Sequence, residues 1–225
     1  MQCSLDLHAS RVGRLIASVY FYRSQNQSKS PFEAIYGEST VYPQTLKGEI
    51  MEQHSRPGWS EYYMGIAMSV RERADCLGNR VGAILVLHDR IISTGYNGTP
   101  ARMKNCTDGG CERCANRQRY KSGSGYDLCI CVHAEQNSLL AAARFGIATE
   151  GAVLYSTMRP CFGCTKELLQ ARVEGVFYLH EWVYPEVVMQ EQYAYLQSEF
   201  PLGVVPVDMV DDRADWAVST RRKNH

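Results

Sequence analysis

The sequence lacks a long apolar run and an excess of charge of either sign. Its 24 lysines and arginines balance 24 aspartates and glutamates, so the formal net charge is zero. A zero net charge gives no global electrostatic reason to bind nucleic acid or a membrane surface. No stretch approaches the roughly 18 apolar residues of a membrane span, so we expect no membrane partner. The 225 residues, 45% of them hydrophobic, are instead typical of one globular domain with extensions.

Nine cysteines are present, enough for the disulfide framework of a secreted protein. They gather, however, around Cys-x-x-Cys pairs and a histidine. That clustering favours reduced thiols and bound metal, and therefore a cytoplasmic protein.

The candidate chemistry lies in two short motifs, H-A-E at 133–135 and P-C-F-G-C at 160–164. One imidazole and two thiols make three ligands, and catalytic zinc keeps three protein ligands with one position left for water. The pair of motifs is the H-x-E and P-C-x-x-C signature of the zinc deaminases. The alternative for the thiol pair is a structural knuckle or a redox pair, and Pro160 together with the upstream H-A-E argues against both.

His133, Cys161 and Cys164 are thus the predicted ligands of one catalytic zinc per chain. Zinc lowers the pKa of bound water to about 7, which supplies the nucleophile that hydrolytic deamination of a pyrimidine needs. Glu135, close to the ion but not bound to it, is the predicted proton shuttle. Helical patterns at 136–145 and 165–171 follow the motifs, and a helix start favours the thiolate that zinc requires.

A third motif is I-I-S-T-G-Y-N-G-T-P at 91–100, in which the loop 95–100 comes directly after a strand predicted at 90–95. Together with the two zinc motifs it resembles the deoxycytidylate deaminase family, in the family's order, over about residues 59–182. The resemblance implies hydrolysis of dCMP to dUMP and ammonia, a step in pyrimidine deoxynucleotide metabolism that leads to dTTP. It also implies that Asn97 contacts the nucleotide and that the backbone N–H of Ala134 lies near the base. Members are commonly hexameric and often regulated by dCTP and dTTP, so we expect a homo-oligomer.

Further cysteines predict a second, structural zinc. Cys111 and Cys114 have the Cys-x-x-Cys spacing of a zinc knuckle, and Cys106 is a short loop away. Cys76 precedes a hairpin predicted from 81–87 and 90–95. Four thiolates close a tetrahedral site, and some family members resemble this arrangement. Cys129 and Cys131 are alternates for a member of the set, and Cys131 could instead pack beneath the active site as a small apolar group. The remaining alternative is a loop of reduced, unliganded thiols.

Basic residues in two places could recognise phosphate. The segment around 113–127 contains Arg113, Arg117, Arg119 and Lys121 with two tyrosines; it could bind a 5′-phosphate, hold single-stranded nucleic acid, or be a solvated insertion. The resemblance implies a role in phosphate or effector binding for Arg144, since family members carry a basic residue in this part of the helix that is linked to such binding. An arginine at the end of a helix also stabilises the helix dipole without a ligand.

The predicted fold is α/β, a three-layer α/β/α cytidine deaminase-like domain with a mixed sheet and helices on both faces. We expect a helix at 61–73 capped by Ser60, a hairpin of 81–87 with 90–95, and strands at 151–155 and 176–179. A helix at 185–196 and a strand at 204–210 follow. The predicted divisions are an N-terminal extension of unknown role (1–55), the deaminase domain (56–184), and a C-terminal extension with a polar tail (185–225). Residues 1–55 could also reflect a misplaced start, because Met51 and the polar residues after it resemble a natural chain start.

Two other functions remain open from the sequence alone. One is a zinc deaminase that acts on another cytosine or adenine carrier, such as dCTP, a nucleoside or tRNA. The other, from a different class, is a catalytically silent zinc-containing nucleotide sensor or DNA-uptake accessory. Glu135 argues against the second, because a binding module needs no proton shuttle, and zero net charge argues against RNA.

Overall fold

The computed structural model describes residues 56–120 and 125–219, which belong to one compact unit. The predicted extension at 1–55 lies outside the described residues. Five strands form one sheet in the order β2-β1-β3-β4-β5. β1 pairs antiparallel with both β2 and β3, whereas β3, β4 and β5 run parallel. The sheet is therefore mixed, as predicted. The strands are β1 (Gly82–Leu87), β2 (Arg90–Tyr96), β3 (Val153–Met158), β4 (Gly175–His180) and β5 (Val204–Pro206).

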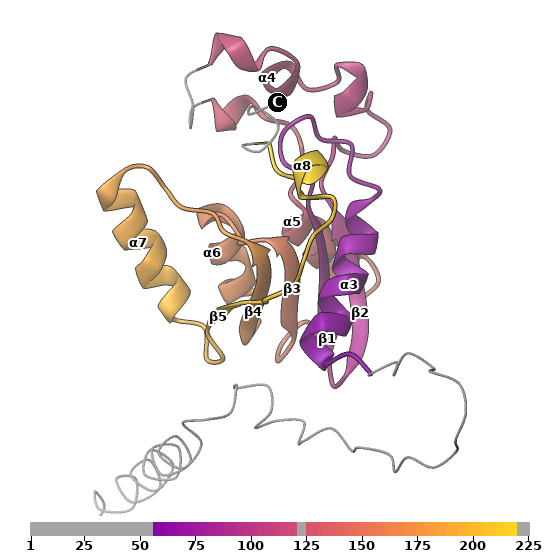
Figure 1. Cartoon of the computed structure of the whole chain (residues 1–225), viewed down its shortest axis with the longest axis vertical. Helices are drawn as coiled ribbons and strands as arrows, with labels where there is room; N and C mark the ends of the chain where they lie inside the picture. The colour runs from indigo at the N-terminus through magenta and orange to yellow at the C-terminus, as the bar shows by residue number, and fades with distance from the viewer. Residues whose placement is uncertain (1–55, 121–124, 220–225) are drawn as a thin grey trace, which may run out of the picture. The chain divides into compact units, whose positions relative to one another are not determined.

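Two glycines let helices approach the sheet closely from opposite sides. A Cβ on Gly82 would lie 2.2 Å from the Ala67 carbonyl oxygen of α3 (Trp59–Arg71), and a Cβ on Gly95 would lie 2.1 Å from the Ala134 carbonyl oxygen of α5 (Ala134–Arg144). Gly95 pairs with Ala83, the residue after Gly82, and successive strand residues face opposite sides. Helices α3 and α5 therefore cover opposite faces, which gives the predicted three layers (Figure 1).

The elements match the predicted ones with shifted ends. Helix α3 begins two residues earlier than expected, and its cap is Gly58, whose N–H donates to the Glu61 carboxylate at 2.9 Å; the assignment of Ser60 as N-cap was wrong. The predicted hairpin is confirmed as β1 and β2, joined at His88 and Asp89, which both have positive φ as a tight two-residue turn requires. The other helices are α6 (Phe162–Gln170), α7 (Val187–Ser198), and the short α4 (Glu112–Ala115) and α8 (Ala214–Ala217).

The C-terminal segment is joined closely to the rest of the fold. β5 extends the sheet beside β4, and Asp211 forms a bidentate ion pair with Arg71 at the end of α3. Farther on, the Ser219 N–H donates to the Asn79 side chain at 2.8 Å. The boundary that we predicted between 184 and 185 stays a prediction.

The segment between β2 and α5 has little regular structure. It contains α4 and the 3-10 turns η1 (Cys106–Asp108), η2 (Arg117–Arg119) and η3 (Tyr126–Leu128). Figure 1 shows this segment beyond one end of the sheet, near α8. Within the described residues, no helix is long and apolar enough to cross a membrane.

Candidate metal centre and its pocket

The three predicted zinc ligands converge from two helix starts. His133 is the N-cap of α5, Cys161 is the N-cap of α6, and Cys164 lies in the first turn of α6. The Nδ1 atom of His133 is 3.4 Å from the Cys161 sulfur and 3.3 Å from the Cys164 sulfur, and the two sulfurs are 3.6 Å apart. A tetrahedral zinc with Zn–S near 2.3 Å and Zn–N near 2.0 Å holds its ligand atoms roughly 3.5 to 3.8 Å apart. The trio therefore fits one zinc ion.

Local contacts fix the two helix starts. The backbone N–H of His133 donates to the Gln136 side-chain oxygen at 3.0 Å, and the Gln136 amide donates to Glu167 of α6 at the same distance. One side chain thus caps α5 and ties it to α6. Because both ligand motifs lie at these helix starts, the relative position of α5 and α6 determines the distances between the ligand atoms.

The charge states of the trio depend on one another. The hydrogen bond between Cys161 and Cys164, helped by His133, lowers the pKa of Cys161 to about 4 in spite of burial. The Cys161 thiolate in turn raises the pKa of His133 to about 9, although burial acts in the opposite direction. A cation that binds here competes with the proton on His133, as expected for a ligand set of neutral imidazole and thiolates.

Glu135 lies beside the trio, as the sequence predicted. Its Oε2 atom is 3.7 Å from the Cys164 sulfur, and its side chain is buried. Burial raises the pKa of Glu135, while the charge of His133 and a hydrogen bond from Ser156 oppose the rise. A carboxyl group with a raised pKa, next to a metal site, is suited to taking up and returning a proton.

Ser156 is a site residue that our reading of the sequence missed. Its hydroxyl donates to Glu135 Oε1 at 3.3 Å from the middle of β3. The available signal was a pair of hydroxyl residues, Ser156 and Thr157, inside a strand that is otherwise largely apolar. Thr157 instead accepts the Gly82 N–H at 3.1 Å.

A pocket adjoins the metal trio and reaches the insertion between β2 and α5. Two of the predicted nucleotide contacts, Asn97 and Ala134, line it. The Asn97 amide is already engaged, since its oxygen accepts the Val81 N–H and its nitrogen donates to the Asn79 carbonyl, each at 2.8 Å. Its contact with the nucleotide stays a prediction. The pocket lining comprises Cys76, Gly78, Asn79, Val81, Asn97, Arg113, Cys114, Arg117, Cys129, Cys131, His133, Ala134, Glu135, Met158, Arg159, Trp182 and Ser219.

The basic residues divide between the pocket and the surface. Arg113 and Arg117 line the pocket, whereas Arg119 is exposed and pairs with Glu112. Arg144 is exposed at the far end of α5, where its guanidinium lies 5.8 Å from the Phe145 ring. Arg144 lies ten positions after Ala134 in the helix, roughly 15 Å along the axis, so the role of Arg144 in phosphate or effector binding stays a prediction.

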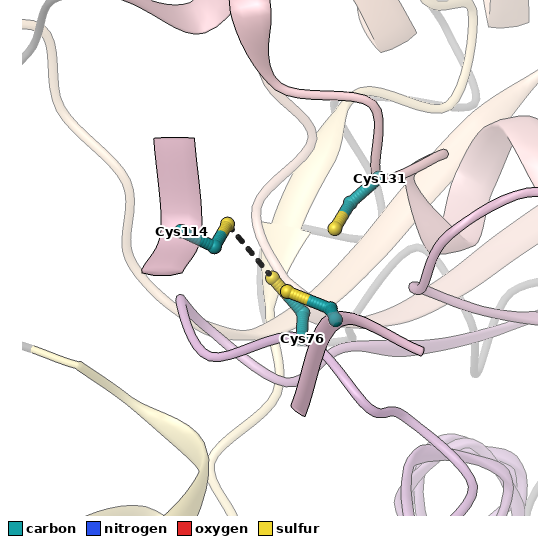
Figure 2. Close-up of side chains that lie close together, drawn as sticks. Cys76, Cys114 and Cys131 are labelled. Carbon is teal, nitrogen blue, oxygen red and sulfur yellow. Dashed lines mark hydrogen bonds between the residues drawn. The ribbon is translucent and has the colours of Figure 1, made fainter. Parts of the chain in front are cut away.

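The predicted structural zinc has more candidate ligands than the four that we chose. Cys76, Cys106, Cys114 and Cys131 have sulfurs within 4.8 Å of one another, and so do the sulfurs of Cys111, Cys114, Cys129 and Cys131. Cys76, Cys114 and Cys131 point toward one another (Figure 2). The expected grouping of Cys111 with Cys76 and Cys106 was therefore wrong, because Cys111 approaches Cys129 instead, at 3.8 Å. Cys129 and Cys131, named as alternates, complete the two groups.

Comparisons with known proteins agree with this geometry. Residues 57–180 match the family model for the cytidine and deoxycytidylate deaminase zinc-binding region. The deoxycytidylate deaminase of Schizosaccharomyces pombe is 41% identical over 123 residues, which cover 55% of this chain but only 37% of that protein. The deoxycytidylate deaminase of Mycobacterium phage D29 is 38% identical over 135 residues, 56% of this chain and 98% of the relative.

A solved structure resembles the fold. The dCMP deaminase of cyanophage S-TIM5, in complex with dCMP and dUMP, aligns with a TM-score of 0.51 and 32% identity over 69% of this chain and 100% of that one. The family model covers the region that holds the metal trio. The chain therefore belongs to the cytidine and deoxycytidylate deaminase family and carries the family's zinc-binding region at residues 57–180.

Proposed function

We propose that this protein hydrolyses dCMP to dUMP and ammonia. The observation that carries the proposal is the convergence of His133, Cys161 and Cys164 beside the buried carboxyl of Glu135, at the wall of a pocket. The relatives named deoxycytidylate deaminase and the S-TIM5 complex with dCMP and dUMP support the choice of substrate. The chain spans little more than a third of the length of the S. pombe relative. The activity proposed for this chain is therefore inferred first from the geometry of its own site.

The chain's own groups can perform the proton transfers. When bound, zinc would lower the pKa of the attacking water to about 7 and so supply the nucleophile. Glu135 Oε2 is the atom that takes one proton from this water and gives it to the ring nitrogen, and then takes the second proton from the added hydroxyl and gives it to the departing amine. Ser156 donates to Oε1 and so keeps Oε2 directed toward Cys164. Burial raises the pKa of Glu135, which favours uptake of the proton by this carboxyl.

The same site could serve other substrates, so the test is a substrate panel. The zinc-loaded protein would be supplied with dCMP, dCTP, deoxycytidine and a tRNA anticodon stem, and released ammonia would be measured. The proposal expects the highest kcat/KM for dCMP. A higher value for any other member would overturn the substrate, and no ammonia from any of them would favour the silent sensor.

Two arginines in the pocket provide a basis for selecting a monophosphate. Arg113 and Arg117 line the same pocket as His133 and Glu135. The Arg117 guanidinium is held by the Leu77 carbonyl at 3.1 Å and can present its remaining N–H groups to phosphate oxygens. Charge-assisted hydrogen bonds contribute about 1.5–3 kcal/mol.

Arg117→Gln should therefore raise KM for dCMP by about 10- to 100-fold and leave kcat for deoxycytidine unchanged. Steady-state kinetics on both substrates would measure this difference. Arg119→Gln is the matched control, because Arg119 is exposed and pairs with Glu112 outside the pocket. Equal effects of the two substitutions on dCMP would argue against a phosphate contact at Arg117.

We further propose a cytoplasmic homo-oligomer that responds to dCTP and dTTP. Support for self-association comes from two exposed apolar side chains, Leu140 in α5 and Phe145 at its C-cap, which are 54% and 74% exposed. Leu140→Asp should lower the molar mass measured by light scattering, whereas Glu150→Gln, at an exposed ion pair with Arg172, should not. An unchanged mass in both variants would contradict this interface. Addition of dCTP or dTTP to the dCMP assay tests the effectors.

A further inference from the structure

We propose that the six cysteines beside the pocket hold two zinc ions, with Cys114 and Cys131 bridging them. Two tetrahedral ions need eight ligand positions, and six thiolates fill eight positions only if two of them are shared. The structure contains two groups of four sulfurs within 4.8 Å of one another, and these groups share two members, Cys114 and Cys131. Two shared sulfurs are the number that six thiolates need in order to give each of two ions four ligands.

The sulfur separations fit zinc and not disulfides. Cys76 lies 3.9 Å from Cys114, and Cys129 lies 3.9 Å from Cys114 and 3.8 Å from Cys111. A Zn–S length near 2.3 Å places the sulfurs of a tetrahedral ion roughly 3.8 Å apart, whereas a disulfide brings them to about 2.05 Å. All these cysteines are free.

Backbone N–H groups also point at two of the sulfurs. The Leu77 N–H donates to the Cys106 sulfur at 3.4 Å, and the Gly78 N–H donates to the Cys76 sulfur at 3.3 Å. Hydrogen bonds to the sulfur stabilise the charged form that ligates metal. Six thiolates with two divalent ions carry a net charge of about −2, and Arg113 and Arg117 lie in the lining of the same pocket.

The metal pair would also explain how the insertion folds. The cluster of buried side chains in this region consists of cysteines, with Leu77 packed against it. Where the structure describes the segment around them, at 97–120 and 125–133, its helical elements are α4 and 3-10 turns. So few apolar contacts cannot offset the cost of ordering such a segment, and bound metal commonly replaces a core in this situation.

This arrangement links the insertion to the catalytic centre. Cys131 is two residues before His133, and the intervening Val132 exchanges backbone hydrogen bonds with Gly98, at 2.8 and 3.2 Å. Four of the six cysteines line the pocket with His133 and Glu135. The metal pair would therefore form part of the pocket wall and hold the segment that carries Arg117.

The test measures metal in the full-length protein. Zinc per chain, from native mass spectrometry and elemental analysis after dialysis, should be three: one in the catalytic trio and two in the six-cysteine site. A value of two would overturn the proposal, since it matches a single structural ion. A visible absorption band with bound iron would also overturn it, because iron–sulfur clusters use the same thiolates.

Cadmium substitution reports the bridges directly without any mutation. With ¹¹³Cd in place of zinc, the wild-type protein should give two all-thiolate resonances that are split by scalar coupling through the shared sulfurs. One such resonance, or two without mutual coupling, would overturn the bridging.

Two single substitutions then separate the sites. Cys111→Ala removes a ligand that only the second ion uses, so zinc should fall to two and the coupling should vanish. Cys161→Ala is the matched control: zinc should also fall to two, but both coupled resonances should persist. Retention of three zinc ions in Cys111→Ala would overturn the assignment.

Discussion

Glu135→Gln should lower kcat for dCMP by about 10²- to 10⁴-fold and leave the zinc content unchanged. Glutamine keeps the size of the side chain and can still contact Ser156, which donates to Oε1 at 3.3 Å. It cannot accept and release a proton at the position of Oε2. Since Glu135 is not one of the three ligand residues, the metal site should persist.

The measurement pairs dCMP kinetics with zinc analysis of the same preparation. Cys161→Ala serves as the comparison, because it removes a ligand and should lose both the catalytic zinc and the activity. A Glu135→Gln protein with full zinc and near-normal kcat would refute the proton shuttle. Loss of zinc would instead indicate that Glu135 contributes to the ligand geometry.

The grouping of the metal trio was predictable because its determinants are local. His133 and Glu135 lie two residues apart, and Cys161 and Cys164 lie three apart, so each motif occupies one helix start in the chain. A single long-range relation, between α5 and α6, completes the site. The alternation of strands and helices is also a local pattern, and it predicted the layers of the fold. The cap of α3 at Gly58 could not be located from residue propensity.

The six-cysteine site was not predictable to the same degree because its partners come from distant points of the chain. Cys76 and Cys131 are 55 positions apart in the sequence, and the segment between them has little periodic structure. The Cys-x-x-Cys spacing singled out Cys111 and Cys114 as candidate ligands, which stays a prediction, and gave no information on which sulfur each approaches. The engagement of Asn97 with Asn79 and Val81 is likewise a tertiary contact that no local motif encodes.

The buried pair of Arg71 and Asp211 is another long-range contact that the sequence did not indicate. The Arg71 Nη1 and Nη2 atoms donate to the Asp211 carboxylate at 2.7 and 2.8 Å, and His180 Nε2 lies 2.6 Å from the same carboxylate. The side chains of Arg71 and Asp211 are 1% and 3% exposed. Burial tends to raise the pKa of Asp211, but the hydrogen bonds of Arg71 and His180 and the charge of Arg71 lower it well below its usual range.

Asp211→Asn should therefore lower the free energy of unfolding at pH 7 by about 3–5 kcal/mol, because it leaves the Arg71 guanidinium buried without a counter-ion. Urea denaturation of zinc-loaded protein measures this loss. Glu150→Gln, which breaks an exposed pair with Arg172, is the matched control and should cost at most about 1 kcal/mol. Equal losses in the two variants would contradict the importance of the buried pair.

The pH dependence provides an independent check on the same contact. A carboxyl group whose pKa is lowered by folding adds stability above its unfolded pKa, near 3.9, and that stability disappears as the pH falls toward the folded pKa. The difference in unfolding free energy between wild type and Asp211→Asn should thus be constant from pH 5 to 7 and should shrink below about pH 4. Because Asp211 joins the C-terminal segment to α3, whose end leads to Cys76 and the hairpin, acid should loosen this connection in the wild type as the substitution does at neutral pH.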